Sequence, residues 1–234
     1  MAYRKLKPEA MSEALTLTSL PLFPLGTVLY PGGLLPLQIF EVRYLDMIGK
    51  CHKTGAPFGV VSLTEGSEVR KPANVAPKGA LPGGDGFAHE AFNAVGTLAK
   101  IIEFSVPQPG LMVVLCQGIH RFTITRREKL KHGLWIADVV RMEDDLPVRI
   151  PHDLQKSAEA LGKLIKGLLH GDTPPEKMPM QPPYHLDDCS WVANRWCELL
   201  PMPLAVKQRL MELDNPLLRL ELVCDILERN GISR

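Results

Sequence analysis

The stretch that decides the fold reads Leu20-Pro21-Leu22-Phe23-Pro24-Leu25, then Val28-Leu29-Tyr30-Pro31-Gly32, Leu35-Pro36-Leu37 and Ile39-Phe40-Glu41-Val42-Arg43-Tyr44. Its prolines cannot donate the hydrogen bonds that a central strand requires. We therefore expect this stretch to wind along the edge of a barrel rather than fill a flat sheet. Gly32 and Gly33 predict a turn inside it. We interpret its last part, Phe40, Glu41, Arg43 and Tyr44, first as residues that build the fold and only second as ligand contacts.

The composition is that of an ordinary folded protein. The chain has 234 residues, with 27 Lys and Arg against 26 Asp and Glu, and 45% of it is hydrophobic. This balance is enough for a sizeable core in one large or two small domains, and it argues against dominant disorder. The 21 prolines are about 9% of the chain, where about 5% is usual. Because proline interrupts helices, a long coiled coil is excluded and an all-helical solenoid is disfavoured.

Charge, cysteine content and hydropathy exclude several classes of protein. The net charge of +1 argues against a protein built mainly to bind nucleic acid. The five cysteines include no CxxC pair, so neither a disulfide framework nor a zinc ribbon is expected. Residues 1–13 lack the apolar core of a signal peptide, and the longest apolar run, Leu111–Cys116, is too short to span a bilayer. We predict a cytoplasmic protein that does not contact membranes.

The first part of the chain predicts strands, after a flexible tail at residues 1–14. Residues 15–150 carry short apolar or alternating runs between turn signals, which is typical of a β-barrel or sandwich. We expect Leu111–Cys116 to be a strand buried on both faces, and residues 41–49 to form a short helix. A long loop rich in Gly, Pro and charge occupies residues 64–94. The expected strands cover residues 15–22, 58–63, 95–106, 111–116, 120–125 and 134–140.

The second part, residues 151–234, predicts a helical domain. Apolar residues from Leu154 to Leu168 recur at helical spacing, and Gly171 is a stop signal. Residues 173–184 hold five prolines and predict an extended linker. We expect Trp191 and Trp196 to be core residues rather than a ligand platform. Later helix starts are indicated by Asp187 or Asp188, by Pro203 and by Asp214-Asn215-Pro216.

Catalytic and metal-binding motifs are absent from the sequence. There is no phosphate-binding P-loop and no nucleophile elbow. His89-Glu90 begins an HExxH zinc pattern, but Asn93 stands where the second histidine is required. His185, Cys189 and Cys197 are metal-capable, yet we favour buried thiols in a helix core. We therefore predict no enzyme activity, no cofactor and no metal.

Several motifs together resemble the N-terminal substrate-binding domain of Lon, the ATP-dependent protease. The quoted proline-rich stretch resembles the start of that domain, and the resemblance spans Leu15 to Ile232. It implies an α+β fold, in which a PUA-like pseudo β-barrel is followed by a C-terminal helical bundle, and a role in capturing unfolded or damaged protein. The later motifs that carry it are Val95-Gly96-Thr97-Leu98-Ala99-Lys100-Ile101, Gly118-Ile119-His120-Arg121-Phe122 and Lys207-Gln208-Arg209-Leu210-Met211-Glu212.

The leading hypothesis is a stand-alone, non-enzymatic Lon-N-like binding module. It would recognise exposed apolar segments of unfolded or partly unfolded proteins, or act as an adaptor or regulator in proteolysis with protease components as partners. We place its site in the groove between barrel and helices, because such clefts favour binding. We expect Tyr30, Arg43, Phe87 and Arg121 to be exposed contacts there.

Two alternatives stay open. A PUA-like protein could bind RNA through the basic hairpin Arg121–Lys131, although we favour a solvated hairpin because the overall charge is neutral. A small-molecule enzyme hidden in the same groove would require titratable groups that converge on a pocket. The cations of the hairpin are Arg121, Arg126, Arg127, Lys129 and Lys131.

Overall fold

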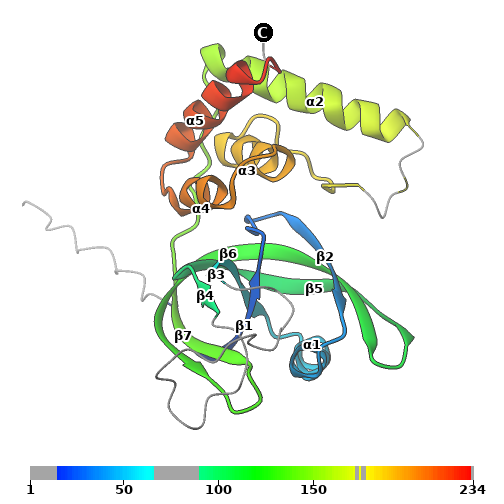
Figure 1. Cartoon of the computed structure of the whole chain (residues 1–234). Coiled ribbons are helices and arrows are strands. Elements are labelled where there is room, and N and C mark those ends of the chain that lie inside the picture. Colours follow the sequence, from blue (N-terminus) through cyan, green and yellow to red (C-terminus); the bar gives the residue numbers. More distant parts are fainter. Residues whose placement is uncertain (1–14, 66–89, 172–173, 175–177, 233–234) are drawn as a thin grey trace, which may run out of the picture.

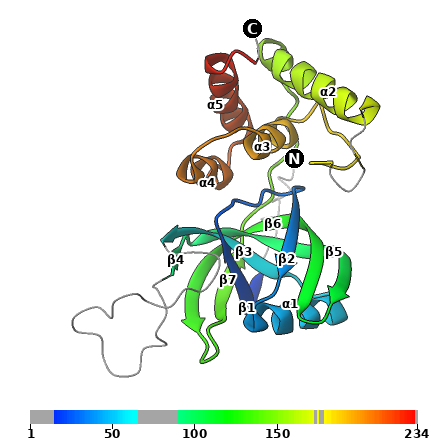
Figure 2. The same ribbon diagram turned by 45° about the vertical axis from the view of Figure 1, so that its right-hand side comes forward.

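In the computed structural model, a layer of helices stacks on a barrel-like layer of strands (Figures 1 and 2). The structure describes residues 15–65, 90–171, 174 and 178–232. The predicted tail at residues 1–14, most of the 64–94 loop with Phe87, and part of the 173–184 linker therefore lie outside the described residues. The α+β fold is confirmed, whereas the division into two domains at residue 150 stays a prediction.

The strands form a ring that is only partly closed. In the described residues the order is β1-β7-β6-β5-β3, and a short parallel pairing of β1 with β3 links the two ends along part of their length. Two strands lie outside this ring, because β2 pairs with β6 and β4 pairs with β3. The strands are β1 Thr16–Leu25, β2 Leu34–Ile39, β3 Phe58–Glu65, β4 Ala91–Phe92, β5 Val95–Gln108, β6 Leu111–Lys129 and β7 Trp135–Arg141.

The prolines mark the places where the ring changes partners. Pro21 pairs with β7 and Pro24 with β3, and β1 exchanges one neighbour for the other at Leu22. Among the described strands, each half of β1 thus has a single partner and one open side, where a proline costs no ladder hydrogen bond. Pro36 lies in β2, which pairs with β6 alone. The expected path along a barrel edge is confirmed in this sense.

A single long strand replaces two predicted ones. β6 runs through both 111–116 and 120–125 and pairs with β5, β2 and β7 in turn. The expected burial of Leu111–Cys116 on both faces is wrong, because only Val114 and Cys116 are buried. Gly118 lets two chain segments cross, since a Cβ atom there would lie 2.2 Å from the carbonyl oxygen of Tyr30.

Helix α1, Val42–Thr54, lies against the barrel on the side away from the helical layer (Figure 1). It is longer than predicted, because the chain continues as a helix through Gly49 and ends at Gly55, whose φ of 68° is left-handed. Its inner face buries Tyr44, Met47 and Ile48 in the barrel core. This packing therefore holds the first turn of α1 against the ends of β1 and β2.

The helices of the second layer begin and end at the predicted signals. Asp188 caps α3 by accepting a hydrogen bond from the backbone N–H of Trp191, and Asn215 caps α5. Trp196 is buried and donates its indole N–H to the carbonyl of Ser157 on α2, so its predicted core role is confirmed. The elements are the short 3-10 turn His152–Leu154, α2 Gln155–His170, α3 Cys189–Leu199, α4 Leu204–Glu212 and α5 Pro216–Arg229.

Candidate functional site

Tyr30, Arg43 and Arg121 are not exposed contacts. Their relative exposures are 0%, 5% and 3%, so the expectation that they are exposed is wrong, and Phe87 lies outside the described residues. The Tyr30 hydroxyl donates to the Lys207 carbonyl at 2.6 Å, which ties the barrel to α4. Whether any of these residues affects peptide binding stays a prediction.

Arg43 is a structural residue at the start of α1. Its guanidinium donates to the Gly133 carbonyl and forms ion pairs with Glu41 and Glu90 at 3.0 and 3.1 Å. Glu90 also accepts a hydrogen bond from the indole N–H of Trp135. The fork geometry of arginine satisfies several acceptors at once, and this explains why Arg43 is buried here.

Arg121 joins the two layers. It donates to the carbonyls of Met211 and Leu213 and pairs with Asp145 at 2.9 Å. Arg219 of α5 reaches the same carboxylate at 2.6 Å. Burial opposes ionisation of Asp145, but the hydrogen bonds and charge of Arg219 and Arg121 outweigh it and hold the pKa of Asp145 below its usual value.

The basic hairpin is not a continuous cationic stripe. Arg121 is turned into the joint, Arg127 lies over the Phe92 ring at 4.8 Å, and Lys129 lies over the Trp135 ring. Arg126 is exposed beside Glu128, and Lys131 is exposed at the hairpin turn. This geometry fits the solvated hairpin that we favoured, and RNA binding stays an untested prediction.

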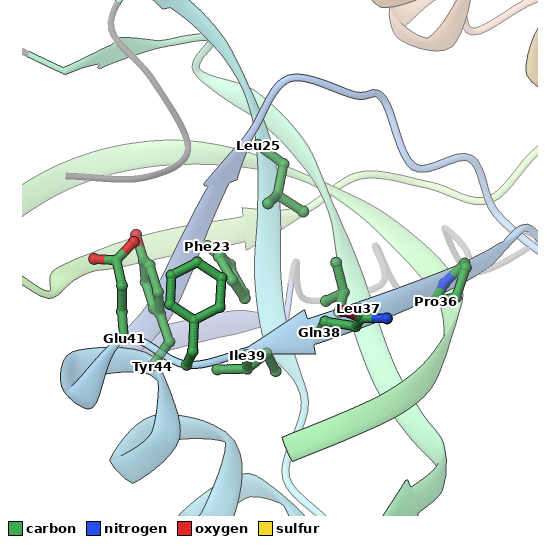
Figure 3. A pocket seen from close by; sticks show the side chains of 9 residues that line it. Phe23, Leu25, Pro36, Leu37, Gln38, Ile39, Glu41 and Tyr44 are labelled. Atoms are coloured by element: carbon green, nitrogen blue, oxygen red, sulfur yellow. The ribbon is translucent and has the colours of Figure 1, made fainter. Parts of the chain in front are cut away.

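A pocket of about 210 Å³, lined mostly by apolar residues, lies between β1, β2 and the start of α1 (Figure 3). We call it the seam pocket. Its floor includes Phe23 and Tyr44, whose rings stack at 4.0 Å. Phe40 lines it while remaining 55% exposed, so an apolar ring is already at its mouth. The lining residues are Phe23, Leu25, Pro36, Leu37, Gln38, Ile39, Phe40, Glu41 and Tyr44.

The seam pocket adjoins an open strand edge. The Gly33 carbonyl accepts from the Gly118 N–H at 2.9 Å, and β2 then pairs with β6 without a register shift. Because backbone groups alternate along a strand, those of Leu35, Leu37 and Ile39 face β6, and those of Pro36 and Gln38 face away. β2 has no second partner among the described strands, so this edge can accept an added strand.

The predicted groove between barrel and helices also exists, with a different lining. This interlayer cleft of about 480 Å³ lies between the Pro31–Gly32 turn, the segment before α2, and the start of α3. Trp191 contributes an aromatic wall, so it is not simply a core residue as predicted. Much of the remaining lining is ionisable: Asp145, Arg149, His185, Asp187 and Asp188.

Neither a metal centre nor a reactive thiol is supported by the geometry. Within the described part of the chain, no three His, Cys, Asp or Glu side chains gather closely enough to hold a metal ion. Burial raises the pKa of Cys116 to about 12 and those of Cys189 and Cys197 to about 11. These thiols are therefore protonated near neutral pH and are poor nucleophiles.

Comparison with known proteins places the whole architecture in one family. The family model of the ATP-dependent protease La (LON) substrate-binding domain matches residues 19–229. The chain belongs to the Lon substrate-binding domain family. The matched Lon domain is the substrate-binding part of the protease rather than its catalytic part, and the seam pocket and the cleft both lie within the matched residues. A comparison with curated proteins returned no similar sequence.

Solved structures of Lon N-terminal domains share this fold. A Lon N-terminal domain protein from Xanthomonas campestris is 29% identical, with a TM-score of 0.65, and the match covers 89% of this chain and 98% of that one. The N-terminal domain of Mycobacterium avium complex Lon protease is 15% identical, with a TM-score of 0.52 and coverages of 88% and 96%. The predicted family is therefore confirmed. In the described residues of this Lon-type domain, no helix is both long and apolar enough to cross a membrane.

Sequence reasoning missed the seam pocket even though it quoted most of its residues. Phe23, Leu37 and Phe40 belong to the proline-rich stretch that decides the fold, and we interpreted Phe40 first as a residue that builds the fold. The available signal was Phe40 itself, a large apolar residue between a strand and a helix, beside a strand that contains proline. Such a residue has no obvious buried position.

Proposed function

We propose that this Lon-type substrate-binding module recognises exposed apolar segments of other proteins by adding them as an extended strand to the free edge of β2. One large apolar side chain of the segment would enter the seam pocket. The observation that carries the proposal is the combination of an apolar pocket with unpaired backbone groups on the same strand. Backbone pairing supplies affinity without sequence preference, and the pocket selects for an apolar side chain.

The pocket and the strand edge together are suited to weak, reversible binding. Burying one large apolar side chain contributes about 2 kcal/mol, and each added backbone hydrogen bond contributes about 1 kcal/mol net. Pro36 removes one outward donor from β2, so few hydrogen bonds can form. With two or three such hydrogen bonds the sum is about 4–5 kcal/mol, so we expect dissociation constants of roughly 0.2–1 mM for a single segment.

The interlayer cleft is the weaker choice for this function. Its lining includes three aspartates, one of which holds the two layers together through Arg121 and Arg219. The charged side chains in its lining must be desolvated when an apolar segment enters, and this opposes binding. The seam pocket offers five apolar strand residues and two aromatic rings of the α1 start instead.

The proposed adaptor role in proteolysis would use the same site. A module that holds an unfolded segment without cleaving it can deliver that segment to a protease component, and this remains part of the proposal. The family membership supports substrate binding, and the delivery step is tested only by reconstitution with a protease.

The proposal is tested by titrating a fluorescent, permanently unfolded model protein, with binding read by anisotropy. Phe40→Ser should weaken binding because it removes an exposed wall of the pocket, and because Phe40 is exposed, the variant should remain folded. Gln38→Pro should weaken binding because it removes an outward N–H, while Gln38→Ala retains the N–H and serves as the matched control.

The outcomes separate the two parts of the mechanism. If Phe40→Ser loses binding while Gln38→Pro and Gln38→Ala bind equally well, the pocket is part of the binding site and strand addition is rejected. Absence of binding when the unaltered protein is titrated to about 1 mM would reject the proposed function. Leu146→Ser removes another exposed apolar side chain, far along the chain from the pocket, and should leave binding unchanged.

A further inference from the structure

A second apolar hollow lies in the helical layer, between α4 and α5. We call it the α4–α5 groove, and its cavity of about 340 Å³ is within the range of binding pockets. It belongs to the upper layer in Figures 1 and 2, whereas β2 and α1 belong to the barrel layer below. The lining residues are Val206, Arg209, Leu210, Leu213, Leu222, Asp225, Ile226 and Arg229.

The groove exists because α5 carries apolar residues on two faces. Its inner face buries Leu220, Val223 and Leu227 in the helical core. On another face Leu222 remains 39% exposed, and Ile226 follows one turn later. A surface helix that packs on one side needs only one apolar stripe, so the second stripe indicates a surface that another element covers.

The rim of the groove carries unneutralised positive charge. Arg209 of α4 and Arg229 of α5 are both exposed, and neither forms an ion pair with another described residue. In contrast, Arg219 of α5 is paired with Asp145, as is Arg121 of β6. Two guanidinium groups from opposite walls therefore converge on one apolar hollow, and they offset the single rim carboxylate of Asp225.

We propose that the α4–α5 groove is the docking site for an amphipathic helix of a partner protein, whose apolar stripe is flanked by carboxylates. The walls are two helices joined by a short turn, and a third helix can place its side-chain ridges between them. An extended strand is disfavoured here because helices present no open backbone edge. Carboxylates beside the stripe would meet Arg209 and Arg229 as bidentate partners.

A second copy of the chain is a poorer occupant. In a symmetric contact, the same patch faces itself, so the guanidinium groups of two copies would be brought together. Positive rim groups outnumber the negative one, and like charges in contact oppose such an association. The proposal does not rest on the function of the seam pocket, and the two sites lie in different layers, so both can be occupied at once.

The test uses two synthetic helical peptides of about 18 residues, long enough to be helical when bound. Both carry Leu at i, i+4, i+7 and i+11, and one has Glu beside this stripe where the other has Lys. Binding to the full chain is measured by fluorescence anisotropy and mapped by amide chemical-shift changes. We expect the Glu peptide to bind about tenfold or more tightly than the Lys peptide, with shifts confined to α4 and α5.

Substitutions in the α4–α5 groove test whether the peptides bind there. Reversing both rim charges, Arg209→Glu with Arg229→Glu, should invert the peptide preference, and Leu222→Ser should weaken both peptides. Leu169→Ser is the matched control, because it removes an exposed leucine from α2 and should change nothing. Thermal melting followed by circular dichroism checks that each variant is folded.

Three results would overturn the proposal. These are equal binding of the Glu and Lys peptides, retention of binding in folded Leu222→Ser, and self-association of the unaltered chain that Leu222→Ser abolishes in light scattering. The last result would identify a second copy as the occupant. Loss of unfolded-protein binding at the seam pocket would not bear on this test, because its probes are preformed amphipathic helices.

Discussion

Glu198 is an acidic group held at the joint between the two layers, and its titration should make the stability of the protein depend on pH near neutrality. Its carboxylate accepts from Arg195 at 2.7 Å and packs against Gly33, where a Cβ atom would lie 2.0 Å from the carboxylate oxygen. Burial raises the pKa of Glu198 from 4.5 to about 7, against the opposing charges of Arg195 and Lys207.

The sign and size of the effect follow from this pKa. Below about pH 4.5 the carboxyl is protonated in both states, and its contribution to stability is fully present. Between 4.5 and 7 the unfolded chain releases the proton and the folded chain retains it, so the free energy of unfolding falls as pH rises. At about 1.4 kcal/mol for each pH unit, the upper limit is roughly 3 kcal/mol. Because the side chain retains 19% exposure, we expect about 2 kcal/mol.

The perturbation is Glu198→Gln, which retains an acceptor for Arg195 and cannot ionise. Urea unfolding followed by tryptophan fluorescence, repeated between pH 5 and 8, gives the free energy at each pH. The unaltered protein should lose stability over this range relative to Glu198→Gln, and the exposed-site control Glu159→Gln should follow the unaltered protein. Parallel pH profiles for all three proteins would refute the reasoning, and so would a Glu198→Gln profile that falls more steeply.

Four further experiments test the packing, the charges and the thiols. Gly118→Ala should lower the free energy of unfolding by about 2 kcal/mol or more, because its methyl group meets a backbone carbonyl. Gly167→Ala, inside α2 with open space around it, should raise that free energy by about 0.5–1 kcal/mol in the same urea titrations. Asp145→Asn leaves two buried guanidinium groups underpaired and should lower the melting temperature, with a cost of about 3 kcal/mol at neutral pH that shrinks as acid protonates the unaltered protein. With a thiol reagent at pH 8, half-buried Cys224 should react before Cys116, which should react only after denaturation.

Local rules predicted the helices of the second layer because their signals lie within one turn. Asp188 and Asn215 cap the helices that the sequence indicated, and Gly231 ends α5 with a left-handed φ of 71°. The strands were harder to predict. The path of β1 from β7 to β3 and the fusion of two predicted strands into β6 depend on pairing between distant segments, which no local pattern encodes.

The buried arginines explain why the contact residues were misplaced. Arg121 alternates with buried Phe122, and in an isolated sheet this alternation puts the arginine in water. Here α4 and α5 cover that face, and carbonyls at the end of α4 and just beyond it accept the guanidinium hydrogen bonds. Arg43 was interpreted first as a residue of the fold, and its three partners support that interpretation over the exposed contact. Burial of such residues is set by the neighbouring layer rather than by their own strand.

Pro36 links the fold to the proposed site. An open strand edge invites aggregation, and proteins commonly protect it with short strands and prolines. β2 is six residues long, and Pro36 removes one of its outward donors, so an extended polymer of paired edges is disfavoured. The same edge still presents the outward groups of Gln38 next to the apolar seam pocket. The edge therefore suits short, transient pairing with one apolar segment, as a module that binds and then releases unfolded chains requires.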